Sequence, residues 1–151
     1  MRSIISKTMM LVAIAATLFS FSSGFGGEGF EIYLNNKVVI QQFGKEINEV
    51  KNLQLDQNSY NDQLIIKYHH CGRVGKNRIV SIQDAENKVL KEWHFVDAST
   101  AVAGMNFNVK EILSLKKSGN SVLKLYYSST ELPRGRLLTN IIVGNNGVVR
   151  R

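Results

Sequence analysis

From Phe30 onwards, apolar and polar residues alternate with a period of two more often than with the 3.6-residue period of a helix. Short apolar or alternating runs are separated by Asn, Gly, Asp and Ser, which favour turns. The runs with this form are FEIYL, KVVIQQF, KNLQL, QLIIKYHH, RIVSIQD, VLKEWHFVD, MNFNV, SVLKLYYS and LLTNIIV. Strands at such short spacing predict an all-β fold, a single antiparallel β-sandwich of about eight to nine strands.

Turn residues predict how several of these strands are joined. Asn35 and Asn36 tolerate the positive φ of a tight two-residue turn, so we expect a hairpin there. The segment 85–88 predicts a second hairpin. Residues 129–138, STELPRGRLL, contain the only proline and are expected to form a turn or loop. One segment, VKEILSLKK, could form a short helix of about two turns, which needs the sheet beneath it.

Bulky residues on alternate positions give the expected core. In VLKEWHFVD, Val89, Lys91, Trp93 and Phe95 share one face, and the two aromatic residues make it the better core candidate. In SVLKLYYS, the corresponding face carries leucines and a tyrosine. Packed sheets bury one face of each strand, so these faces are expected to meet between two sheets.

The N-terminal residues differ from the rest of the chain. Two basic residues, Arg2 and Lys7, precede an uncharged apolar run that ends in small residues near Gly24. This order is typical of a secretory signal peptide, and the apolar run is shorter than the roughly 20 residues of a membrane-spanning helix. We therefore expect a signal peptide over residues 1–24, a β-sandwich domain over 25–151, no stable membrane span after cleavage, and a periplasmic or secreted protein.

Charge and cysteine content narrow the classes of partner. Without the first 24 residues the chain has seventeen basic and twelve acidic residues, a formal excess of about +5. The partner of an exported basic protein can be another protein or an anionic envelope component. The chain has no basic stripe interleaved with aromatic residues, so we do not expect it to bind nucleic acid. The single cysteine, Cys71, cannot close an intramolecular disulfide. The oligomeric state is left open by the sequence.

The expected signal peptide is followed by the segments FEIYLNNKVV, RIVSIQDAENKVLKEWHF and VLKLYYSSTELPRGRLL. In this arrangement the chain resembles the small exported β-sandwich proteins of uncharacterised function from Bacteroidetes-type bacteria. The resemblance implies an immunoglobulin-like topology with at most one short helix and a location in the cell envelope. It transfers no catalytic residue to this chain, and we expect no cofactor. The chain lacks the cysteine pair that bridges the sheets of true immunoglobulin domains.

The run YHHCGR, residues 68–73, carries the side chains best suited to metal binding or nucleophilic attack. If it ends a strand, His69 and Cys71 share one face while His70 lies on the other. A metal centre would then use His69 and Cys71, with His94 as a third ligand if its strand lies alongside. Alternatively, Cys71 acts as a nucleophile with His69 or His94 as its base. Strand-end packing of these residues is the interpretation we favour.

Two basic turns are the other candidate feature. GRVGKNR places Arg73, Lys76 and Arg78 in a glycine-containing turn that lacks the spacing of a phosphate-binding loop, so we expect these side chains in solvent. The second turn adds Arg134 and Arg136. If both turns lie at one end of the sandwich, their cations would form a patch for an anion or a partner protein.

Together these observations predict an exported, non-catalytic β-sandwich with a binding or structural role in the bacterial cell envelope. The alternative is a small metal-binding protein that uses His69, Cys71 and His94.

Overall fold

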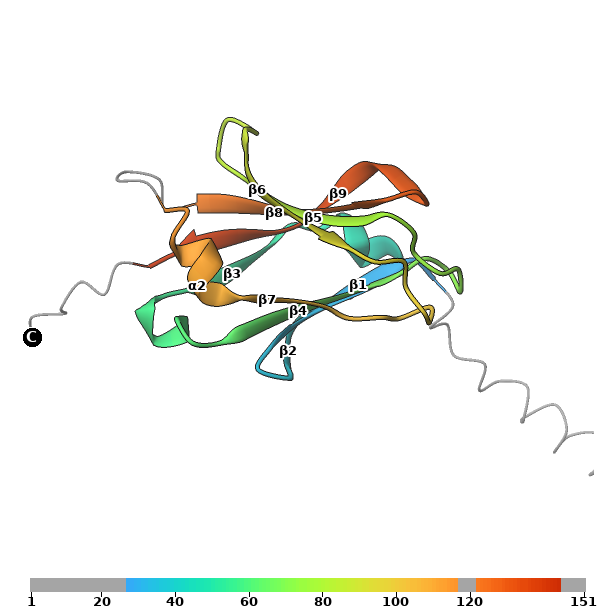
Figure 1. The fold of residues 1–151 in the computed structure, drawn as a ribbon, viewed down its shortest axis with the longest axis horizontal. Coiled ribbons are helices and arrows are strands. Elements are labelled where there is room, and N and C mark those ends of the chain that lie inside the picture. Colours follow the sequence, from blue (N-terminus) through green and yellow to red (C-terminus); the bar gives the residue numbers. More distant parts are fainter. Residues whose placement is uncertain (1–26, 117–121, 145–151) are drawn as a thin grey trace, which may run out of the picture.

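Two β-sheets lie face to face in the computed structural model, which describes residues 27–116 and 122–144 (Figure 1). One sheet has four strands in the order β2-β1-β4-β7, and the other has five in the order β3-β9-β8-β5-β6. The strands of the four-stranded sheet are β1 (Gly29–Leu34), β2 (Lys37–Phe43), β4 (Gln63–His69) and β7 (Met105–Asn108). Those of the five-stranded sheet are β3 (Lys51–Leu55), β5 (Arg78–Gln83), β6 (Val89–Phe95), β8 (Val122–Ser129) and β9 (Leu132–Val143).

The helical segments described are short. They are the 3-10 helices η2 (Gly44–Asn48) and η3 (Gln57–Ser59) and the α-helix α2 (Val109–Leu113). The predictions of a mostly β chain, of about nine strands and of one short α-helix are confirmed over the described ranges. None of the helices in these ranges has the length and apolar character needed to span a lipid bilayer. The predicted signal peptide, residues 1–24, lies outside the described residues.

The prediction of purely antiparallel sheets is wrong at one edge. β3 pairs parallel with β9, in register from Lys51 opposite Thr139 to Leu55 opposite Val143. The Thr139 hydroxyl donates to the carbonyl oxygen of Lys51 at 2.7 Å. The chain leaves β2 in one sheet, turns through η2 and enters the other sheet at β3. Alternation of side chains is the same in parallel and antiparallel strands, so it does not predict strand direction.

The predicted hairpins at residues 35–36 and 85–88 are confirmed. Asn35 and Asn36 have φ of 49° and 66°, the left-handed values that a tight turn between β1 and β2 requires. Between β5 and β6, Asn87 also has a positive φ, 64°. The Asp84 carboxylate accepts hydrogen bonds there from the backbone N–H groups of Glu86 and Lys88. Local side-chain chemistry therefore fixes both turns.

The predicted turn within residues 129–138 is present at Thr130 and Glu131, but the strand after it begins at Leu132, earlier than expected. Ser129 pairs with Leu132, and Tyr127 pairs with Arg136, so β9 advances four residues while β8 advances two. Gly135, with φ of +67°, allows the backbone to absorb this bulge. Proline and glycine thus mark an irregular strand start here rather than a loop.

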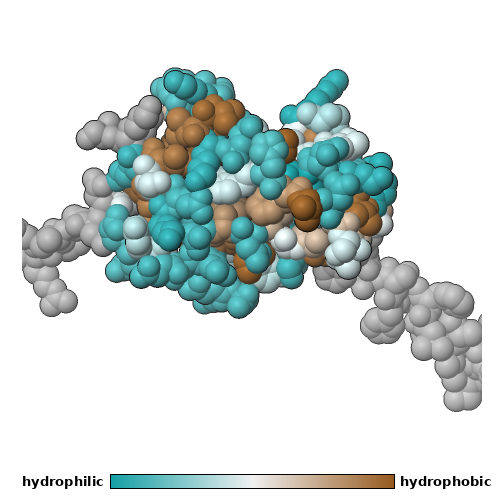
Figure 2. Space-filling view, in the orientation of Figure 1, coloured by the Kyte–Doolittle hydropathy of each residue, from teal (hydrophilic) through white to brown (hydrophobic). Residues whose placement is uncertain are grey.

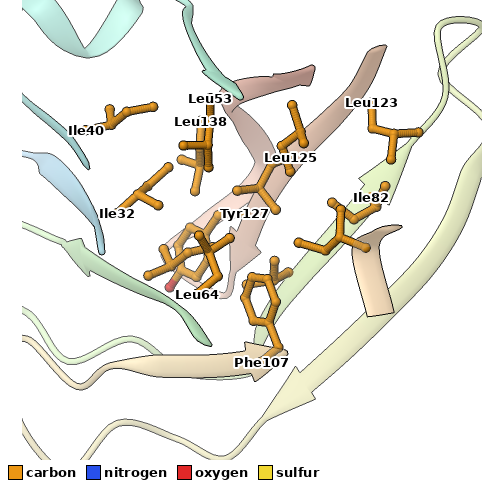
Figure 3. Close-up of a cluster of buried hydrophobic side chains, with 14 of the residues drawn as sticks. Ile32, Ile40, Leu53, Leu64, Ile82, Phe107, Leu123, Leu125, Tyr127 and Leu138 are labelled. Atoms are coloured by element: carbon orange, nitrogen blue, oxygen red, sulfur yellow. The ribbon is translucent and has the colours of Figure 1, made fainter. Parts of the chain in front are cut away.

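The core lies between the two sheets and contains alternate side chains of nearly every strand (Figure 3). In β8 these are Leu123, Leu125 and Tyr127, as predicted. In β6, Trp93 and Phe95 pack partly buried against the core, but Val89 is exposed, contrary to its predicted place on that face. The register shifts between Ile82 and Gln83, where β6 contains an additional residue, and this bulge interrupts the alternation before Trp93.

Candidate functional site

The structure does not bring the predicted metal ligands together. His69 lies in β4, with Nε2 3.4 Å from a carboxylate oxygen of Glu31. Cys71 is exposed in the turn after β4. His94 lies in β6 of the other sheet, and its side chain is 69% exposed. Within residues 27–116 and 122–144, no three side chains of His, Cys, Asp or Glu are grouped closely enough to hold a metal ion.

His70 faces the interior, as the alternation along β4 predicts. It is only 4% exposed, and its Nε2 lies 2.9 Å from the Tyr127 hydroxyl and 3.4 Å from that of Ser129. Burial lowers the pKa of His70 from its ordinary value, so the neutral ring is favoured. β4 ends at His69, and the chain turns at Cys71, which has φ of 52°. Among the described side chains, no histidine is hydrogen-bonded to the Cys71 thiol, so the structure does not form the predicted pair of Cys71 with His69 or His94.

Two hydrogen-bonded groups, joined by ring contacts of Tyr68 with His70 and Tyr127, lie at this end of the core. We define the inner polar cluster as Glu28, Tyr68, His70, Tyr127 and Arg136. The Tyr68 hydroxyl donates to Oε1 of Glu28 at 2.6 Å and accepts from Nε of Arg136 at 2.9 Å. The Tyr68 and Tyr127 rings stack with centroids 4.5 Å apart. Burial, followed by the hydrogen bond to Glu28, raises the pKa of Tyr68 well above its ordinary value. The polar side chains of the cluster thus have protein partners.

The predicted cationic patch is smaller than expected. The two basic turns do lie side by side, because the N–H of Thr130 donates to the Lys76 carbonyl oxygen and the N–H of Lys76 donates to the Glu131 carboxylate. The expectation that Arg78 lies in solvent is wrong: it is 5% exposed, and its guanidinium donates to the carbonyl oxygens of Val96 and Ala103. Arg136 belongs to the inner polar cluster. Arg73, Lys76 and Arg134 remain exposed.

The outer face of the five-stranded sheet carries a hollow of about 230 Å³. Figure 1 shows the β5–β6 and β8–β9 hairpins rising from the sheet on the side away from the other sheet. The polar side chains lining this outer hollow are Ser81, Gln83, Glu92, Tyr126, Ser128 and Arg134. The rest of the lining comes from Val89, Tyr127, Pro133 and Gly135, although the Tyr127 side chain is buried. The hollow therefore combines residues of four strands, β5, β6, β8 and β9.

Strand register explains how these residues meet. Ser81 is opposite Glu92 on one side and opposite Tyr126 on the other, so the three form a row across the sheet. Ser81 is the smallest of the three, and its short side chain leaves the depression between its larger neighbours. The bulged start of β9 places Arg134 beside the row. Residues far apart in the sequence thus line one shallow site.

Most polar groups of the outer hollow have no partner within the described parts of the chain. The side chains of Ser81, Gln83, Tyr126, Ser128 and Arg134 make no hydrogen bond there, and Glu92 approaches only the exposed His94, at 3.6 Å. Hydrophilic side chains cover most of the molecular face seen in Figure 2, and the hydrophobic residues form separate patches. The outer hollow is therefore a polar site with groups available to a ligand.

Sequence reasoning missed this site because its residues match no motif. Outward polar residues on half-buried strands are ordinarily a solvated surface. The sequence signal that could have pointed to the site is the pair Tyr126–Tyr127, because alternation places one of these two tyrosines on the outward face of its strand. The neighbours of that outward tyrosine across the sheet depend on the register, which the sequence pattern does not supply. Comparison with known proteins found no family model and no curated protein that matches this chain.

Proposed function

We propose that this chain is an exported, non-catalytic binding module of the bacterial cell envelope, and that its ligand occupies the outer hollow. The observation that carries this proposal is the convergence of six polar side chains on one depression, five of them without a protein hydrogen-bond partner in the described residues. Polar groups aimed at a concave surface orient a ligand and give specificity.

A binding role fits the lining better than catalysis does. Glu92 is the only carboxylate among the lining residues, and hydrolysis by paired acids needs two. The lining includes the hydroxyls of Ser81 and Ser128 but no histidine that could activate them. With a single acid and no lining histidine, the hollow has neither a paired-acid nor a serine–histidine arrangement, and its groups suit recognition.

An immunoglobulin-like β-sandwich topology is part of the proposal. The order β9-β8-β5 matches the G-F-C order of such domains, and the pairing of β4 with β7 matches that of strands B and E. In this assignment β4 and β8 are the strands that a disulfide joins in antibody domains. Here Tyr68 of β4 stacks on Tyr127 of β8 instead. An aromatic contact between the sheets would then replace the bridge that a chain with one cysteine cannot form.

Export is supported by the order of charged, apolar and small residues in the first 24 positions. N-terminal sequencing of protein recovered from a bacterial periplasm or medium tests it. A mature N-terminus near residue 25 is expected, whereas an intact Met1 on protein confined to the cytoplasm would contradict export.

The binding role is tested by NMR titration of the purified protein with a library of small polar fragments. Fragments that bind are expected to shift the amide signals of Ser81, Gln83, Glu92, Tyr126 and Ser128. The Ser81→Leu variant fills the hollow and should abolish these shifts, whereas Ser99→Leu, in an exposed loop, should keep them. Shifts that are absent, or that persist in Ser81→Leu, would contradict a site in the hollow.

A further inference from the structure

We infer that the outer hollow binds a neutral saccharide, with one sugar ring of a longer glycan seated on the row Glu92, Ser81 and Tyr126. This inference rests on the proposed binding function and adds the chemical class of the ligand. It follows from the charge balance of the lining, its hydrogen-bonding groups and its shape.

The charges of the lining balance each other. Glu92 supplies one negative charge and Arg134 one positive charge. An anionic ligand would meet the Glu92 carboxylate, and a cationic ligand would meet the Arg134 guanidinium, so neither is favoured overall. A neutral polar ligand can use both charged groups as strong hydrogen-bond partners without repulsion.

The hydrogen-bonding groups suit the hydroxyls of a sugar. Glu92 only accepts and Arg134 only donates, whereas Ser81, Ser128 and the Gln83 amide do both. A ligand that satisfies this mixture needs several groups that donate and accept, and neighbouring hydroxyls on a sugar ring have this property. An apolar ligand would leave these groups desolvated and unpaired, which weakens binding.

The shape of the hollow fits one ring of a chain. At about 230 Å³ it is smaller than the roughly 300–1,000 Å³ of pockets that enclose drug-sized ligands. Tyr126 forms one side of the row and lines the hollow, and an aromatic ring is a side chain that can pack against the C–H face of a sugar ring. The site lies on an outer sheet face, so the rest of a glycan could extend beyond the hollow.

Calorimetric titration of the full chain with cellopentaose, xylopentaose, maltopentaose and mannopentaose tests the inference. At least one oligosaccharide is expected to bind. Tyr126→Ala should weaken this binding about tenfold, because the aromatic surface is lost. Arg134→Ala should also weaken it. The matched control is Tyr60→Ala, which removes an exposed tyrosine outside the hollow and should leave the affinity unchanged.

Parallel NMR titrations with inorganic phosphate and with the dipeptide Ala-Ala separate the two proposals. Shifts of the hollow's amides with either probe, together with no binding of any oligosaccharide, would overturn the saccharide assignment and retain the binding function. If neither these probes, the polar fragments nor the sugars shift those amides, both proposals are wrong. Oligosaccharide binding that Tyr126→Ala leaves unchanged would also overturn the assignment.

Discussion

Tyr126 and Tyr127 are neighbours in β8 and both border the outer hollow, yet only Tyr127 has a buried side chain, which belongs to the inner polar cluster. Tyr127 is 1% exposed, and its hydroxyl lies within hydrogen-bond distance of His70. Tyr126 faces outward, and its hydroxyl has no hydrogen-bond partner among the described residues. Successive side chains of a strand point to opposite faces of the sheet, so the two tyrosines have different surroundings although they are adjacent in the sequence.

The difference shows what distinguishes structural polar groups from groups available for binding. In the inner polar cluster, buried polar atoms pair with each other, since an unpaired buried group would destabilise the fold. In the outer hollow, water can satisfy the same kinds of group until a ligand replaces it. Residue type alone therefore does not separate the two groups of side chains, whereas the presence or absence of protein hydrogen-bond partners does.

The largest expected contrast is between Tyr127→Ala and Tyr126→Ala. Removing the buried ring of Tyr127 should lower the free energy of unfolding by about 3–5 kcal/mol, through lost packing and a cavity. The Tyr126→Ala change should alter it by no more than about 0.5 kcal/mol. Urea denaturation of both variants measures the difference, and similar losses would show that the two rings do not have separate roles.

A smaller contrast is expected between Arg136→Ala and Arg134→Ala. Arg136 bonds to Tyr68, to Asn48 and to Glu28, so its removal leaves partly buried acceptors unpaired. The expected loss of unfolding free energy is about 1–3 kcal/mol. Arg134→Ala should leave stability nearly unchanged while weakening ligand binding. A stability loss in Arg134→Ala as large as that in Arg136→Ala would contradict the division.

The smallest expected effect is a pH dependence from His70. Its pKa in the folded chain lies below the ordinary 6.5, so the unfolded chain binds the proton more readily. Stability from the neutral buried ring is present above pH 6.5 and is lost as the pH falls towards the folded pKa. The loss cannot exceed about 1.4 kcal/mol per pH unit for one proton.

Denaturation between pH 7.5 and 5.5 measures this effect with matched histidine variants. His94→Gln, at an exposed position, should keep the pH dependence of the unmodified protein, whereas His70→Gln should lose this component. An unchanged pH profile in His70→Gln would show that another group is responsible.

Much of the fold could be predicted because hydrophobic alternation records which strand face is buried. Leu64, Ile66 and Tyr68 of β4 are buried in the expected alternation, and His70 follows them inward. The tight turn at Asn35 and Asn36 was also predictable, since few residues tolerate positive φ. These features depend on local sequence only.

The features that could not be predicted depend on contacts between distant segments. Arg78 is the first residue of β5, and its burial is possible because the segment around Val96 and Ala103 supplies carbonyl acceptors. The outer hollow likewise depends on cross-strand register, with Ser81 placed between Glu92 and Tyr126. The sequence next to Arg78 and next to Ser81 does not indicate which distant residues will contact them.

The parallel pairing of β3 with β9 has a consequence for the time course of folding. The Thr139 hydroxyl bonds to the carbonyl of Lys51, 88 residues earlier, and Arg136 pairs with Glu28, 108 residues earlier. Such distant pairings make folding slow, in the range of milliseconds to seconds for β-rich domains. The five-stranded sheet cannot be completed until the last strand has emerged, so an incomplete chain leaves the edge of β3 unpaired and prone to association with other chains.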